Sequence, residues 1–195
     1  RIIKGRTQLG ADLETIMPVA TGTTGTRLAQ EGNFIPGGGP DERYDFFGSG
    51  VGAFDSTNRF AFSARARNMA TGSTAAANGQ RVLVWDGTNI TLQFKQNDPI
   101  TGLSDIPANP SGDETFGNSV GSIHLLDNGT IGSQDSTINN ISTTRRPAIM
   151  YNSAAFRQSN VSTFTGIDGV TTETWATIAA NAFYTTPDGS HWMAQ

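Results

Sequence analysis

The chain has 195 residues, with 13 Lys and Arg against 17 Asp and Glu, so its formal net charge is -4. The basic residues are scattered along the chain, which disfavours nucleic acid as a partner because such a groove needs concentrated positive charge. The absence of cysteine excludes disulfides and thiolate zinc sites. With 23 glycines and 36% hydrophobic residues, long amphipathic helices are disfavoured, and we expect a single all-β domain over residues 1–195.

The clearest strand signal lies near residue 59, and further signals follow toward the carboxyl terminus. Phe60, Phe62, Ala64 and Ala66 alternate with Arg59, Ala61, Ser63 and Arg65, the period of a half-buried strand. Next, an apolar run at 82–85 meets Asp86-Gly87 and a second alternating segment at 90–95, which predicts two antiparallel strands joined by a tight turn. Asn128-Gly129 and Asp188-Gly189 are similar turn signals.

The sequence also contains internal similarities with a period of about 64 residues. "FGSGVGAFDSTNRFAF" (47–62) resembles "FGNSVGSIHLLDNGTI" (116–131) and, more faintly, residues 175–192. Independently, "RLAQEGNFIPG" (27–37) resembles "QFKQNDPITG" (93–102) and the "FRQSN" segment at 156–160. The two registers agree to one residue, so we expect repeated units of four strands, the content of a propeller blade.

Three propeller-like units are predicted from this register. The first covers approximately residues 45–97, the second 114–160, and the third 172–195, completed by strands from 15–31. The terminal strands would pair within one chain or between chains, which predicts a homo-oligomer or filament. No apolar run is long enough to cross a bilayer and no amino-terminal signal segment is evident, so we expect no transmembrane segment. Because the first residue is Arg1, we expect a processed product or a fragment.

The segments "NRFAFSA", "LVWDGTNITLQFKQNDPITG" and "RLAQEGN" resemble the bacterial exported tandem-repeat proteins built from N-x-x-G-x-x-x-F units. The resemblance covers roughly residues 26–192. It implies a propeller-like β protein that is secreted or associated with the cell surface and has no assigned enzyme activity.

Few residues suggest catalysis. Gly117 to Gly121 spell G-x-S-x-G, the pattern of a hydrolase nucleophile elbow centred on Ser119, but the following residues predict a strand and a turn rather than the required helix. The only histidines, His124 and His191, lack an Asp or second His at ligand spacing, and alternation places His124 on the face opposite Ile123 and Leu125.

Carboxylates and aromatic residues provide the other candidate sites. Acidic pairs occur at Asp41-Glu42 and Asp113-Glu114, and more loosely between Glu42 and Asp45. Calcium is the possible metal, because the turns at 55–58, 86–89 and 97–99 supply oxygen ligands. Trp85, Tyr151 and Trp192 could provide stacking platforms for a carbohydrate, or they could pack in the core.

We therefore expect a non-enzymatic, exported structural protein, without a catalytic residue or required cofactor, that self-associates in an extracellular or cell-surface assembly. A carbohydrate-binding or adhesion module is the first alternative. A hydrolase that uses Ser119 or the loop acids is the second.

Overall fold

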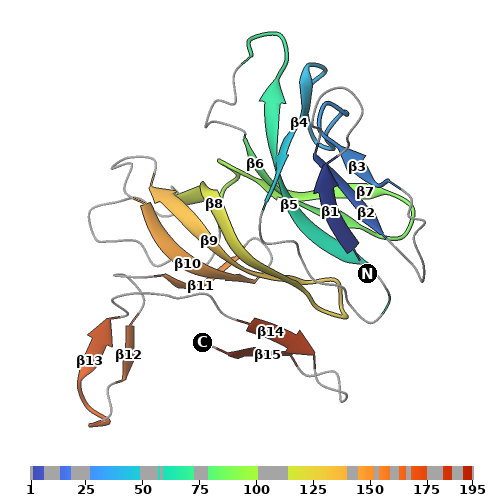
Figure 1. Ribbon diagram of the computed structural model, residues 1–195. Coiled ribbons are helices and arrows are strands. Elements are labelled where there is room, and N and C mark those ends of the chain that lie inside the picture. The colour runs from blue at the N-terminus through green and yellow to red at the C-terminus, as the bar shows by residue number, and fades with distance from the viewer. Residues whose placement is uncertain are drawn as a thin grey trace.

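The computed structural model describes residues 2–6, 14–18, 27–48, 57, 59–72, 79–100, 114–139, 145–151, 154–158, 163–165, 168–174, 182–185 and 191–194. All regular structure in this part of the chain is β, and all its strands pair antiparallel (Figure 1). The expected all-β class is confirmed. Over the same residues, nothing resembles a helix that could span a membrane.

Two four-stranded sheets form the centre of the fold, and in each the strands follow one another in chain order. The first contains β4 (Glu42–Phe47), β5 (Phe60–Asn68), β6 (Gln80–Trp85) and β7 (Ile90–Lys95). The second contains β8 (Glu114–Leu125), β9 (Ile131–Asn139), β10 (Arg145–Tyr151) and β11 (Ala154–Gln158).

Shorter sheets come before and after this pair. A three-stranded sheet contains β1 (Ile2–Arg6), β2 (Glu14–Pro18) and β3 (Ala29–Gln30). Two hairpins follow the second large sheet, β12 (Thr163–Thr165) with β13 (Thr172–Thr174), and β14 (Ala182–Thr185) with β15 (His191–Ala194).

The predicted hairpins are present where their residues are described. Strands β6 and β7 pair antiparallel, and Gly87 in the turn between them has φ 104°. Gly129 has φ 85° in the turn between β8 and β9. The turn at Asp188-Gly189 lies outside the described residues, although the flanking strands β14 and β15 pair as expected.

The middle of the first large sheet is buried on both faces. The prediction of a half-buried strand at 60–66 is therefore wrong for residues 60–63 but holds at 64–66, where Arg65 is exposed between two buried alanines. On one face of β5, Phe60 and Phe62 belong to a hydrophobic cluster centred on Phe47, which we call the Phe47 cluster. On the other face, Ala61 belongs to a cluster shared with the second large sheet, which we call the inter-sheet cluster. Small side chains at Ala61 and Ser63 allow the second sheet to approach, and both are at most 3% exposed.

Two β-bulges explain why simple alternation fails in this sheet. Tyr44 and Phe47 are three residues apart but both belong to the Phe47 cluster, because the register of β4 shifts between Tyr44 and Phe46. A bulge adds a residue to one strand and so reverses the faces of the residues that follow it. In β7, a shift opposite Val82 and Leu83 likewise turns Phe94 toward the inter-sheet cluster.

An aromatic contact joins the two large sheets. The rings of Phe94 and Phe116 stack with their centroids 4.1 Å apart and their planes 12° apart. At the end of the interface, a guanidinium nitrogen of Arg59 donates a 2.9 Å hydrogen bond to the carbonyl of Asp127 in the β8–β9 turn. The two large sheets are therefore joined by a polar contact as well as by the apolar packing of the inter-sheet cluster.

The chain enters both large sheets through similar corners. Before β4, the amide of Gly32 donates to the carbonyl of Tyr44, and the amide of Tyr44 donates to the carbonyl of Asn33. Before β8, the amide of Asn97 donates to the carbonyl of Phe116, and the amide of Phe116 donates to the carbonyl of Asp98.

Further contacts match between the corners. The bridge between Phe34 and Arg43 has a counterpart between Pro99 and Thr115. Residues 32–34 and 97–99, which lie in the two segments that resemble each other in sequence, thus make the same backbone contacts to the next sheet.

Contacts join the three-stranded sheet to the first large sheet, the two large sheets to each other, and the second large sheet to the β14–β15 hairpin. Strand β2 contacts β4, strands β5 and β6 contact β8, and β14 contacts β8. Figure 1 shows the β4–β7 sheet above the β8–β11 sheet and the β14–β15 hairpin below it. Among the described residues, the strands within 15–31 and 172–195 lie in separate sheets, so their predicted pairing is not seen within this chain.

Candidate functional site

A groove of about 620 Å³ opens where the corner before β4 faces the β6–β7 turn. We call it the Trp85 groove. Its lining includes apolar side chains below and polar groups at the rim, among them Leu28, Asn33, Phe34, Tyr44, Trp85 and Asn89.

Trp85 lines the groove as the last residue of β6. It pairs with Phe60 on one side and with Ile90 on the other. Its ring is half-buried and packs against the Phe47 cluster. One part of the indole is thus held by the core while another faces the groove.

Phe34 lies on the wall formed by the corner before β4. Its side chain is 68% exposed, an unusual value for a phenylalanine, and it also lines the groove. The guanidinium carbon of Arg43 lies 3.4 Å from the ring centroid, and an Arg43 nitrogen donates a 2.7 Å hydrogen bond to the carbonyl of Pro40. This cation–π contact holds one face of the ring against the loop.

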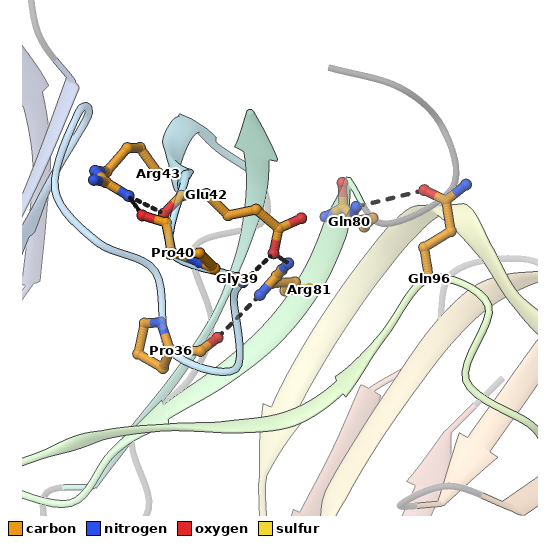
Figure 2. Close-up of polar contacts among 8 residues, drawn as sticks. All are labelled: Pro36, Gly39, Pro40, Glu42, Arg43, Gln80, Arg81 and Gln96. Atoms are coloured by element: carbon orange, nitrogen blue, oxygen red, sulfur yellow. Dashed lines mark hydrogen bonds and ion pairs between the residues drawn. The ribbon is translucent and has the colours of Figure 1, made fainter. Parts of the chain in front are cut away.

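A buried arginine anchors the same loop (Figure 2). The side chain of Arg81 is 0% exposed and donates a 2.7 Å hydrogen bond to Oε2 of Glu42 and a 3.1 Å hydrogen bond to the carbonyl of Pro36. Oε2 of Glu42 also accepts a 2.8 Å hydrogen bond from the amide of Gly39. Pro36 and Glu42 are thus tied directly to Arg81, the second residue of β6, and Gly39 is tied to it through Glu42.

The contacts with Arg81 and Gly39 keep the Glu42 carboxyl ionised. Burial raises the pKa of this carboxyl, but hydrogen bonds from Gly39 and Arg81, together with the charge of Arg81, lower it further than burial raises it. The net pKa of Glu42 therefore lies below its ordinary value. The group is ionised at neutral pH and balances the buried guanidinium.

Tyr44 lies between the anchor and the groove. Burial raises the pKa of its hydroxyl well above the ordinary value, although the charge of Arg81 acts in the opposite direction. The hydroxyl oxygen is buried and has no hydrogen-bond partner within the described part of the chain. The side chain is therefore neutral and contributes mainly its ring to the Phe47 cluster.

The opposite wall is the β6–β7 turn. Oδ1 of Asp86 accepts hydrogen bonds from the amides of Thr88 (2.8 Å) and Asn89 (2.7 Å), which lower the pKa of Asp86. These bonds fix the turn and leave the exposed side-chain amide of Asn89 at the groove rim.

The structure does not support a nucleophile elbow at Ser119. This residue lies inside β8, which continues to Leu125, and the register of β8 shifts on both sides of Val120. An elbow needs a sharp turn from a strand into a helix. The expected strand after Gly121 is confirmed, and so is the placement of His124, which is half-buried between the buried Ile123 and Leu125.

The candidate carboxylates whose side chains are described bind different partners or lie apart along the chain. Glu42 binds Arg81, whereas Asp45 binds Arg65 at 2.6 Å and Arg67 at 2.8 Å. Glu114 is buried at the start of β8. Asp113 lies outside the described residues, and Asp41 is exposed beside Glu42.

The turns proposed for calcium use their carboxylates for backbone contacts. Asp86 accepts from its own turn, and Asp98 accepts a 2.9 Å hydrogen bond from the amide of Lys95. Within the described ranges, no three acidic or histidine side chains gather as they would around a metal ion. Most of the turn at 55–58 lies outside those ranges.

The three predicted aromatic platforms are not assembled into one described surface. Trp85 and Tyr151 end strands β6 and β10, whereas Trp192 is the second residue of β15. Only the side chain of Trp85 is described, and it lines the groove. His191 begins β15, and its side chain is outside the described set.

Sequence reasoning missed Phe34 and Arg81. The sequence does contain a signal that Phe34 could be exposed, since the loop "EGNFIPGGG" offers this aromatic residue no neighbouring apolar residue except Ile35. Arg81 had none, because its partner Glu42 lies 39 positions away.

Comparisons of the chain with protein-family models, with curated proteins and with solved structures found no match. The resemblance to exported tandem-repeat proteins therefore stays a prediction.

Proposed function

We propose that this chain is a non-enzymatic β-repeat protein that works by self-association, as a structural component of an extracellular or cell-surface assembly. The observation that carries the proposal is the matching pair of corners. Residues 32 and 33 bind Tyr44 through the same two backbone hydrogen bonds by which residues 97 and 98 bind Phe116. A corner that is used twice to pass from one sheet to the next favours a propeller-like series of units.

The burial of the first large sheet supports the association step. Both faces of β5 and β6 are covered, one by the Phe47 cluster and the other by the inter-sheet cluster. Units of this kind need a neighbour on each side to bury their apolar faces. In the proposed assembly, the sheets that precede and follow the large pair obtain such neighbours, and pair their outer strands, with another copy of the chain.

Native mass spectrometry and electron microscopy test this proposal. We expect dimers or longer filaments whose population rises with protein concentration from about 1 to about 100 μM, because intermolecular pairing follows mass action. A compact monomer over the whole range would overturn it.

A matched pair of lysine variants tests the route of association. Met193 is in the terminal hairpin, whereas Met69 is a 57% exposed residue in the turn after β5. Lysine on an edge strand blocks pairing between sheets. We therefore expect Met193→Lys to reduce assembly and Met69→Lys to leave it unchanged, with the same circular dichroism spectrum for both. Equal assembly by the two variants would exclude the terminal hairpin as the contact.

A further inference from the structure

We propose that the Trp85 groove is a binding site for a neutral saccharide, a role that is separate from self-association. The groove combines an aromatic base at Trp85, an exposed aromatic wall at Phe34 and an exposed amide at Asn89. Its volume of about 620 Å³ is in the range of small-molecule sites, which typically measure about 300–1,000 Å³.

The aromatic residues fit the apolar faces of a sugar ring. Trp85 is held by the core, so its orientation is fixed before a ligand arrives. Arg43 covers one face of the Phe34 ring, and the residue remains 68% exposed rather than collapsed onto the protein. A preorganised aromatic surface binds with little loss of side-chain entropy.

The polar groups at the rim fit hydroxyl groups. Asn33 and Asn89 come from the two segments that line the groove, and neither side-chain amide has a hydrogen-bond partner among the described residues. An amide offers two donors and an acceptor, which can bind hydroxyl groups that themselves donate and accept.

Most polar groups of the lining are neutral, which fits the hydroxyl groups of a saccharide. Arg27 is the one charged residue among the groove's lining residues, and its guanidinium already donates to the side-chain oxygen of Gln30. The exposed carboxylate of Asp86, in the β6–β7 turn, accepts hydrogen bonds from backbone amides.

The fold itself does not require these groups. In the second corner, Pro99 occupies the position of Phe34, and Asp98 occupies that of Asn33. The Asp98 carboxylate is used by the amide of Lys95. The same corner is therefore built without an exposed aromatic ring, so the exposure of Phe34 needs another explanation, and ligand binding provides one.

Tryptophan fluorescence titration of the full chain tests the proposal. The probes are neutral oligosaccharides of glucose, mannose, galactose and N-acetylglucosamine, with an oligosaccharide of galacturonic acid as the charged comparison. We expect saturable binding of at least one neutral probe. The emission change should be lost in Trp85→Phe, because this variant keeps an aromatic ring in the base while it removes the indole.

Paired variants separate the groove from the rest of the surface. Phe34→Ala and Asn89→Ala should each weaken binding by about tenfold, the effect of one lost stacking or hydrogen-bond contact. The matched controls are Phe46→Ala, which removes another exposed ring, and Asn118→Ala, which removes another exposed amide. Both should leave the dissociation constant within about twofold of the unmodified chain.

Three results would overturn the assignment: no saturable binding of any neutral probe at about 10 mM, binding of the galacturonic acid probe alone, or equal losses in Phe34→Ala and Phe46→Ala. Since Phe34 and Asn89 are exposed, their variants should fold normally, which circular dichroism can verify. The assembly measurements above do not depend on these residues, so the two proposals can fail separately.

Discussion

Replacement of Glu42 by glutamine should destabilise the protein because it leaves a buried cation without its counterion. The side chain of Arg81 is 0% exposed, whereas that of Glu42 is 18% exposed. Removal of one partner of a buried ion pair typically costs about 3–5 kcal/mol. Glutamine keeps one oxygen that can accept from Arg81 and Gly39, so we expect the lower end, a loss of about 3 kcal/mol in the free energy of unfolding.

Replacement of Arg81, the other member of the pair, should reduce the free energy of unfolding by less. Arg81→Met removes the cation and leaves a partly exposed carboxylate that water can solvate, so we expect a loss of about 1–2 kcal/mol. The double variant should lose less than the two single variants combined. The shortfall measures the coupling between the side chains.

Urea unfolding at pH 7, followed by circular dichroism, gives these free energies. Asp41→Asn is the matched control, since the exposed Asp41 carries the same charge beside Glu42, and it should change stability by less than about 0.5 kcal/mol. If Glu42→Gln costs no more than the control, the pair contributes no net charge stabilisation and the anchoring argument is wrong.

The pH dependence provides a second test of the same pair. The pKa of Glu42 is lowered in the folded protein, so its contribution is complete above the unfolded pKa of about 4.3 and is lost as the pH falls through the folded value. The stability difference between the unmodified chain and Glu42→Gln should therefore be full at pH 6–7 and shrink below about pH 4. A difference that stays constant down to pH 3 would refute the assignment.

Three further predictions concern the turn and the sheet interface. Gly87→Ala should cost about 1 kcal/mol because φ is 104° there, whereas Gly39→Ala, at an open position with ordinary φ, should cost much less in the same urea assay. Asp86→Ala should lower Tm and increase hydrogen exchange of the turn amides, and unchanged exchange would contradict its capping role. Phe116→Ala should cost about 3–5 kcal/mol, since the 2% exposed ring stacks on Phe94; a loss below about 1 kcal/mol would mean that the sheets do not depend on this contact.

The parts of the fold that depend on local sequence could be predicted. The β6–β7 hairpin follows from alternation and from Asp86-Gly87, whose conformation needs no distant partner. The two-sided burial of β5 could not be predicted, because Ala61 and Ser63 are compatible with either a solvent-facing or a closely packed surface. Their environment is decided by a second sheet that begins at Glu114.

The groove could be predicted only in part. Trp85 stood out as an aromatic residue at a predicted strand end, and it does line the groove. Its neighbour Phe34 comes from a loop about fifty residues earlier, and the Arg81–Glu42 pair that positions this loop is equally non-local. Hydrophobic periodicity and amino-acid composition contain no information about contacts between residues that lie far apart in the chain.

The bulges have a consequence for comparing the two large sheets with each other. Every residue of a strand has a parity, inward or outward, and a bulge inverts that parity for all residues after it. The extra residues in β4 and β7 show that this chain accommodates single insertions inside strands while apolar residues on both sides pack in the core, Tyr44 and Phe47 in β4 and Leu92 and Phe94 in β7. An alignment of one sheet with the other should therefore allow one-residue gaps within strands, and not only in loops. The one-residue disagreement between the two repeat registers is of the size that one bulge produces.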